Sequence, residues 1–142
     1  MKKHLLLLGL TVAVAAAAFW FGRTTSVQAK TNGRVFEIRT YTAEEGKLEA
    51  LHARFRNHTL KIFQKHGMTN IGYWSPKDEP LTNDTLIYIL AYPSRDAAKK
   101  SWDAFRTDPE WKKVQQESEV NGKLVKKVES VYMDPTDYSP MK

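Results

Sequence analysis

The segment TLIYILAYPSRDAAKKSWDAFRTDPEW, residues 85–111, decides the fold that we expect for this chain. Its first eight residues, 85–92, are almost continuously apolar, which predicts a strand that is covered on both faces. Pro93 and Ser94 then end the strand and cap a helix, and Asp108-Pro109 begins a further short helix. Three apolar residues recur along the first of these helices at offsets of four and three: Ala98, Trp102 and Phe105. One cover for the strand is therefore this helix, and the rest of the chain or a second copy must supply the other.

The first 29 residues differ from the rest of the 142-residue chain. A basic start precedes an uncharged run at residues 5–22, and the small residues Val27-Gln28-Ala29 resemble a signal-peptidase site. We therefore interpret residues 1–29 as a signal peptide and residues 30–142 as one domain that is exported to the periplasm or secreted. The alternative is a retained leader that anchors the domain in the membrane, because the uncharged run is at the lower limit of a membrane-spanning length.

The composition of residues 30–142 excludes several classes of function. These residues carry 19 basic against 16 acidic side chains, with no basic stripe, so we predict no nucleic-acid partner. The chain has no cysteine, which excludes disulfides, thiolate metal sites and cysteine nucleophiles. It also contains no Gly-rich phosphate loop and no Gly-x-Ser-x-Gly motif.

The other segments complete a recognisable order of elements. Residues 34–41 alternate as a strand does, and Thr42 to Glu45 fits a capping box that opens a long helix. Gly67 ends this helix as a left-handed C-cap. Two further strands are expected at 68–74 and 124–133, a hairpin loop at 75–84 and a tail at 134–142. The order β-α-β-β-α-β predicts an α+β sandwich with the ferredoxin-like fold.

Both helices of such a fold lie on one face of the sheet. We assign Glu37, Arg39 and Tyr41 to the opposite face, together with four residues of the central strand: Leu86, Tyr88, Leu90 and Tyr92. An apolar face of this size predicts an interface. We therefore expect two copies to pair sheet to sheet as a homodimeric α+β barrel.

Glu37, Arg39 and Tyr41 are also the main candidates for a site, and all three are candidate catalytic residues. Their spacing places a carboxylate, a guanidinium and a phenol side by side, and Tyr88 could join them as a ligand-binding residue. Buried charges must be paired or must serve a ligand. Arg39 could hold an anionic or carbonyl oxygen while Glu37 or Tyr41 moves a proton. The alternative is an ion pair that fixes the dimer register.

His58, Trp74 and Trp102 are further candidates for ligand binding. His58 and His66 lie on the long helix, but neither is followed by a second ligand at a metal-binding spacing, so we predict no metal and no cofactor, with haem as the alternative. His66 could instead bond free carbonyls in the last helical turn. The two tryptophans could wall an apolar pocket or belong to the core.

Several segments resemble the NIPSNAP family, and together they span essentially the whole mature domain. They are FEIRTYT (36–42), KHGM (65–68), GYW (72–74), LIYILAYPSR (86–95), DPEW (108–111) and PTDYSP (135–140). The resemblance implies a dimeric α+β barrel of ferredoxin-like topology. It does not define an activity, because related barrels include monooxygenases, haem-degrading enzymes and simple ligand binders.

Three functions therefore stay open. The first is an exported homodimer that binds a small, largely apolar molecule in the barrel. The second is a cofactor-independent monooxygenase or isomerase that uses Arg39, Tyr41 and a nearby acid or histidine. The third is a structural or interaction module. A void lined by Glu37, Arg39 and Tyr41 would favour the first two, and a filled interior would favour the third.

Overall fold

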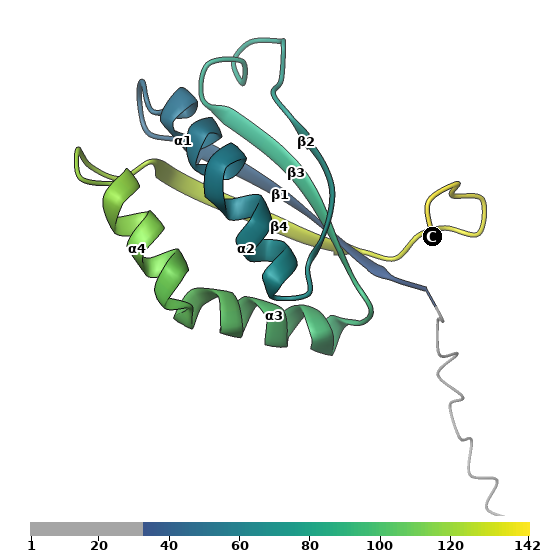
Figure 1. Ribbon diagram of the computed structural model, residues 1–142. Helices are drawn as coiled ribbons and strands as arrows, with labels where there is room; N and C mark the ends of the chain where they lie inside the picture. Colours follow the sequence, from purple (N-terminus) through teal and green to yellow (C-terminus); the bar gives the residue numbers. More distant parts are fainter. Residues whose placement is uncertain (1–32) are drawn as a thin grey trace, which may run out of the picture. The chain divides into compact units, whose positions relative to one another are not determined.

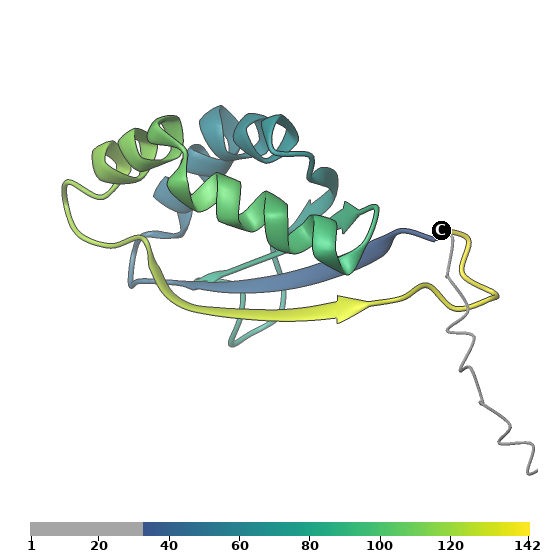
Figure 2. The ribbon, with the colours of Figure 1, turned by 90° about the horizontal axis from the view of Figure 1, so that it is seen from below.

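The computed structural model describes residues 33–142, and the predicted signal peptide lies outside these residues. They form a four-stranded antiparallel sheet with the helices packed on one of its faces (Figures 1 and 2). Within this part of the chain no helix is both long enough and apolar enough to cross a membrane.

The strand order of the sheet is β2-β3-β1-β4. The bounds are Val35–Ala43 for β1, Thr69–Trp74 for β2, Thr85–Tyr92 for β3 and Val125–Met133 for β4. The long central strands β1 and β3 pair with each other, and β4 and β2 form the edges. With the helices that follow β1 and β3, this order confirms the ferredoxin-like α+β fold.

The helices begin and end largely where local signals place them. The first helical segment has three parts, α1 (Leu48–Arg54), a π-helical turn η1 (Phe55–Thr59) and α2 (Leu60–Lys65), and it is followed later by α3 (Arg95–Thr107) and α4 (Pro109–Ser118). Ser94 caps α3 by accepting from the amide of Ala97 over 3.1 Å. Gly67 has a φ of 75°, which confirms the left-handed turn predicted after the long helix.

The predicted capping box at Thr42 to Glu45 is wrong. Thr42 and Ala43 still belong to β1, because Thr42 pairs with Thr85 and the amide of Ala43 donates to the Asp84 carbonyl over 2.7 Å. The helix begins only at Leu48, and the preceding residue makes no side-chain cap. Pairing with the neighbouring strand thus outweighs the local helix signal.

The assignment of side chains to the two faces of the sheet is also wrong. Glu37 faces the helices, because Trp102 Nε1 of α3 donates to its carboxylate over 2.8 Å. On β3, the ring of Tyr88 packs against Phe55 and Phe63 of the first helical segment. The apolar set of Leu86, Tyr88, Leu90 and Tyr92 is therefore the core between sheet and helices. Alternation separates two sets of side chains, but it does not tell which set meets the helices.

The face that carries no helix in the described part of the chain bears the other set of side chains. We call it the helix-free face, and its apolar residues are Phe36, Ile38, Trp74, Ile87, Ile89, Ala91, Val131 and Met133. Two of these side chains stay largely exposed, with 50% of the surface of Trp74 and 59% of that of Val131 open to solvent. The sequence therefore predicted an apolar open face correctly but attributed it to the wrong residues.

Candidate functional site

A buried carboxylate lies at the centre of the layer between sheet and helices. Glu37 is completely buried, and its two oxygens accept from Arg39 Nη1 over 2.5 Å, from the Tyr92 hydroxyl over 2.6 Å and from Trp102 Nε1 over 2.8 Å. These donors come from β1, β3 and α3. A buried charge must be compensated. The three hydrogen-bond donors therefore explain why a glutamate is tolerated in this core.

Arg39 connects this carboxylate to the aromatic part of the core. Its side chain is 16% exposed, and its guanidinium carbon lies 4.2 Å from the ring centroid of Trp102 and 5.6 Å from that of Tyr41. Burial lowers the pKa of Arg39, but its interactions with Tyr41, Tyr88 and Glu37 outweigh this effect and raise the pKa above its ordinary value. Arg39 is therefore a permanent cation, and it is already paired with an anion.

Tyr41 and Tyr88 lie beside Arg39, and Tyr73 stacks on Tyr88. Tyr88 is the direct partner of Arg39 across the β1–β3 pair, and the Tyr88 ring lies 5.2 Å from that of Tyr41 and 5.3 Å from that of Tyr73. The Tyr88 hydroxyl is buried and makes no hydrogen bond of acceptable geometry among the described residues, although the Tyr41 hydroxyl lies near it. Burial, followed by the nearby Tyr41, raises the pKa of Tyr88 well above its ordinary value. The hydroxyl thus keeps its proton at neutral pH.

The structure gathers five of the seven candidate residues and separates the other two. Glu37, Arg39, Tyr41, Tyr88 and Trp102 form one cluster between sheet and helices. His58 is exposed and lines a separate cavity of about 320 Å³ between η1 and α4, and Trp74 lies on the helix-free face.

Two further residues belong to the cluster. The alternation placed Tyr92 on the same face as Glu37, but it did not identify its hydroxyl as a donor to the carboxylate. The position of Tyr73 could not have been found in this way, because β2 has an irregular register between Asn70 and Gly72.

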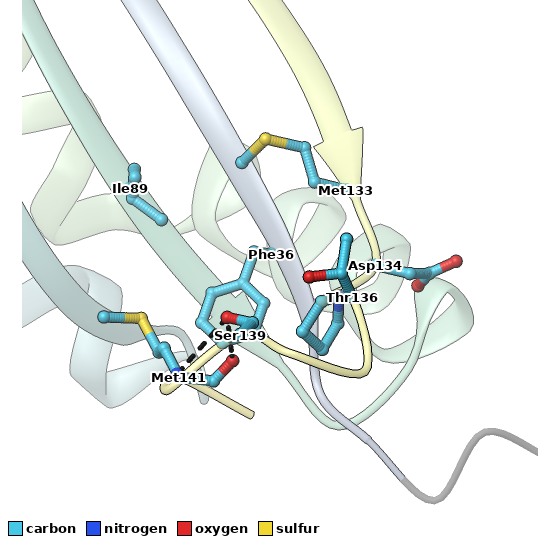
Figure 3. A pocket seen from close by; sticks show the side chains of 8 residues that line it. Phe36, Ile89, Met133, Asp134, Thr136, Ser139 and Met141 are labelled. Carbon is cyan, nitrogen blue, oxygen red and sulfur yellow. Dashed lines mark hydrogen bonds between the residues drawn. The ribbon is translucent and has the colours of Figure 1, made fainter.

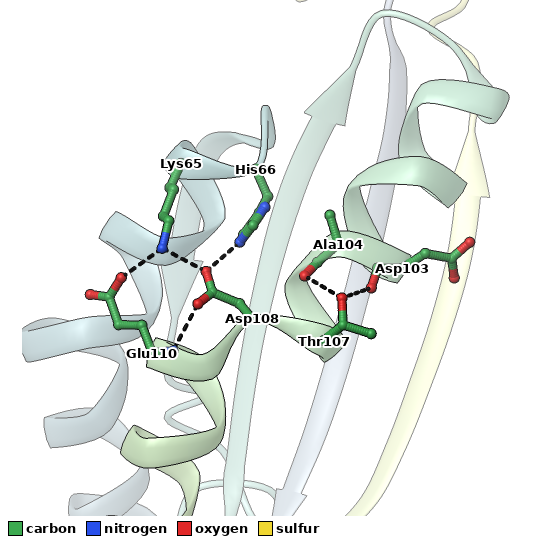
Figure 4. Close-up of polar contacts among 7 residues, drawn as sticks. All are labelled: Lys65, His66, Asp103, Ala104, Thr107, Asp108 and Glu110. Carbon is green, nitrogen blue, oxygen red and sulfur yellow. Dashed lines mark hydrogen bonds and ion pairs between the residues drawn. The ribbon is translucent and has the colours of Figure 1, made fainter.

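Asp108 organises a second polar cluster at the end of α2 (Figure 4). Its side chain is 3% exposed, and it pairs with Lys65 Nζ at 2.8 Å and His66 Nε2 at 2.6 Å. It also accepts from the amide of Glu110 over 2.7 Å and so caps α4 as predicted. Hydrogen bonds from Lys65 and His66 hold the pKa of Asp108 well below its ordinary value. His66 was expected to bond free carbonyls, but its ring instead ties α2 to α4.

A cavity of about 260 Å³ lies on the helix-free face, where the C-terminal tail folds back against the sheet (Figure 3). Most of its walls are apolar and come from Phe36, Ile89 and Met133 of the sheet and from Pro135 and Met141 of the tail. The end of the tail is held by Arg34, whose Nε donates to the last carbonyl over 3.0 Å. In the described residues no group of three or more acidic or histidine side chains is placed to hold a metal ion.

Comparison with known proteins points to one family. The family model described as NIPSNAP matches residues 36–140, and no curated protein matches the chain. A NIPSNAP family protein of unknown function from Agrobacterium tumefaciens is 22% identical with a TM-score of 0.68, over 79% of this chain and 96% of that one. An uncharacterized NIPSNAP-like domain protein from Burkholderia xenovorans is 16% identical with a TM-score of 0.66, over 77% and 90%.

The structure is also similar, more distantly, to that of an enzyme. SnoaB, a cofactor-independent oxygenase from Streptomyces nogalater, is 11% identical with a TM-score of 0.52, over 76% of this chain and 98% of that one. At this level of identity the likeness concerns the fold alone.

Replacing Arg39 with leucine is expected to lower the free energy of unfolding by about 3 kcal/mol, because the Glu37 carboxylate loses its cationic partner in the core. Adding Glu37→Gln should recover much of this loss, since glutamine is uncharged and its oxygen can still accept from Tyr92 and Trp102. Urea unfolding measures both variants. The control is Arg56→Leu, which removes an exposed ion pair with Glu49 and should change stability by less than about 0.5 kcal/mol. Equal losses in the single and double variants would contradict the coupling.

Replacing Asp108 with asparagine should destabilise the protein at neutral pH, because asparagine keeps the helix cap but loses the charge that faces Lys65 and His66. The folded pKa of Asp108 lies below its ordinary value of 3.8, so this stabilisation is present above that pH and is lost as the pH falls toward the folded pKa. The difference from wild type in urea unfolding should therefore shrink on acidification. A difference that is the same in neutral and acid solution would contradict this. Asp103→Asn, which removes an exposed pair with Lys99, is the control and should have a smaller effect.

Proposed function

Since the chain belongs to the NIPSNAP family, we propose that it is an exported homodimer that binds a small, largely apolar molecule between two facing sheets. The observation that carries this proposal is the helix-free face, where no helix covers the sheet in the described part of the chain and the C-terminal tail covers only the part around Phe36. Export to the periplasm or beyond rests on the leader pattern of residues 1–29.

The size of the helix-free face suits a second copy of the same chain. Strands lie about 4.8 Å apart and rise about 3.3 Å per residue, so four strands of this length cover roughly 500 Å². Two such sheets bury roughly 1,000 Å² in total, which is about the minimum for a specific interface. The apolar row of Ile38, Ile89 and Val131 runs across the middle of the face. In the proposed dimer these side chains would be buried and would stabilise the association of the two sheets.

The cavity under the C-terminal tail gives the proposed dimer a place for a ligand. It opens on the helix-free face, so the sheet of a second copy would close it. Its apolar walls suit a small apolar molecule. Because these walls offer few charged groups, the hydrophobic effect would supply most of the affinity.

The alternative of an oxygenase or isomerase receives less support from the geometry. The oxygens of Glu37 are already engaged with three donors. Burial raises the pKa values of Tyr73, Tyr88 and Tyr92, which makes their hydroxyls poor bases at neutral pH. The similarity to SnoaB concerns the fold and assigns no catalytic role to any residue of this chain.

The protein is expected to be a dimer at micromolar concentration, and Val131→Glu should yield a folded monomer, because the new carboxylate would be buried between the two sheets. The matched control is Val120→Glu, the same change at a valine that is 74% exposed in the connection after α4; this variant should stay dimeric. Light scattering gives the mass and circular dichroism checks the fold. A monomeric wild type, or a dimeric Val131→Glu variant, would overturn the arrangement.

The neutral fluorophore N-phenyl-1-naphthylamine is expected to bind the protein with enhanced emission, and Met141→Gln should weaken this binding several-fold by making one wall of the cavity polar. Tyr138→Gln is the matched control, because Tyr138 is a tail residue that is 84% exposed and does not line the cavity. The titration is followed by fluorescence. Equal affinity of the two variants would place the probe elsewhere.

A further inference from the structure

We propose a second binding site, on the opposite side of the sheet from the first, which takes a flat, uncharged molecule through a carbonyl oxygen held by Arg39 and Tyr88. It lies between the β1–β3 pair and the first helical segment. The proposal does not depend on dimer formation or on the cavity of the helix-free face.

Unpaired donors mark the site. Three buried side-chain polar atoms lack a hydrogen-bond partner among the described residues: Arg39 Nε, Arg54 Nε and the Tyr88 hydroxyl. Two of the three belong to Arg39 and Tyr88, which face each other directly in the register of β1 and β3. Buried polar groups in folded proteins are nearly always paired, so two unpaired donors on facing residues call for a ligand or an ordered water.

The chemistry of the two atoms selects the kind of ligand. The Nε–H of arginine can only donate, and the raised pKa of Tyr88 keeps its hydroxyl protonated. A ligand that pairs both donors must therefore offer an acceptor, and a carbonyl oxygen has the two lone pairs that this needs. Arg39 is already neutralised by Glu37 at 2.5 Å, so a carboxylate would bring a second negative charge close to the first. An uncharged ketone, quinone or ester meets the same donors without that repulsion.

The surroundings of Tyr88 favour a flat molecule. Ring centroids of Tyr41 and Phe55 lie 5.2 Å from that of Tyr88, and the Tyr73 ring stacks on it with an interplanar angle of 18°. Aromatic rings bind planar groups by stacking and edge contacts, so a flat ligand can take the place beside Tyr88 that the Tyr73 ring fills in this structure.

A cavity at the β2 edge supplies the entrance. It has a volume of about 220 Å³, and Phe55 and Tyr73 form part of its wall. Both rings also contact the ring of Tyr88, which does not itself line the cavity. We therefore assign Phe55 and Tyr73 as the residues that must shift to admit the ligand.

The backbone on both sides of this entrance is irregular. Phe55 begins the π-helical turn η1, and Tyr73 follows the irregular register of β2. Asn70 joins the two, because it accepts from the Tyr73 hydroxyl over 2.5 Å and donates to the Leu60 carbonyl over 3.0 Å. π-Helical turns and β-bulges are both over-represented next to functional sites.

Three probes of one shape test the proposal by calorimetry: 2-acetylnaphthalene, 2-ethylnaphthalene and 2-naphthoate. The ketone is expected to bind about tenfold more tightly than the hydrocarbon, because only its oxygen meets the buried donors. Tyr88→Phe should remove this tenfold difference by weakening the ketone alone. Arg39→Lys, which keeps a cation beside Glu37 but has no Nε–H, should also weaken the ketone selectively.

The matched control is Tyr92→Phe, the same change on the same strand at a hydroxyl that is engaged with Glu37. It should lower the melting temperature and leave the preference for the ketone unchanged. Several results would overturn the proposal: no detectable binding of the ketone, equal binding of ketone and hydrocarbon, tighter binding of the naphthoate, or a Tyr88→Phe variant that changes only the melting temperature. A ketone affinity that responds to Met141→Gln would place the probe on the helix-free face and would also overturn it.

Discussion

The buried carboxylate of Glu37 is the constraint on which the rest of the structure depends. A charge without exposed surface is tolerated only where donors surround it, and here β1, β3 and α3 each contribute one. The hydrogen bond from Trp102 sets the position of α3 on the sheet. The hydrogen bond from Tyr92, the last residue of β3, connects β3 to β1. If β1 turned its other face to the helices, Glu37 would lose both of these partners. The acid thus helps to determine which face of the sheet the helices cover.

This choice divides the two faces of the sheet between two kinds of chemistry. The helix side holds the ion pair, the tyrosine cluster and most of the large aromatic rings. The helix-free face presents mainly aliphatic side chains, with Trp74 and the tail at its margins. The apolar part of this face suits association with a second sheet, whereas Lys127 and Glu129 on the same face already pair with each other over 3.0 Å. The polar side, by contrast, can discriminate among small molecules through hydrogen bonds.

Much of the fold could be predicted from periodicity and caps, whereas the orientation of the sheet could not. Three local signals act through their immediate neighbours, as expected. Ser94 and Asp108-Pro109 mark where α3 and α4 begin, and Gly67 marks where the first helical segment ends. The partners of Glu37 lie 55 and 65 residues away along the chain, so no local pattern reveals them. The alternation of β1 fits both orientations equally well, so the sequence alone could assign Glu37 to the face opposite the helices, the interior of the expected dimeric barrel, without revealing its donors on β3 and α3. The π-helical turn and the irregular register of β2 likewise arise from tertiary packing, which explains why the position of Tyr73 was missed.

The surroundings of the two buried carboxylates show which nearby polar groups still lack a hydrogen-bond partner. Asp108 pairs with Lys65 and His66, which joins α2 to α4, and it accepts from the amide of Glu110, which caps α4. Glu37 is equally well supplied, so neither acid has an evident need for a further partner. Arg39 differs, because only Nη1 reaches Glu37 and the buried Nε has no acceptor in the described part of the chain. The residue that completes the structural network therefore also leaves a donor beside the unpaired Tyr88 hydroxyl. Polar groups that have all their hydrogen-bond partners stabilise the fold, and groups that lack a partner can recognise a ligand. The ion pair of Arg39 and Glu37 can therefore serve both stability and binding.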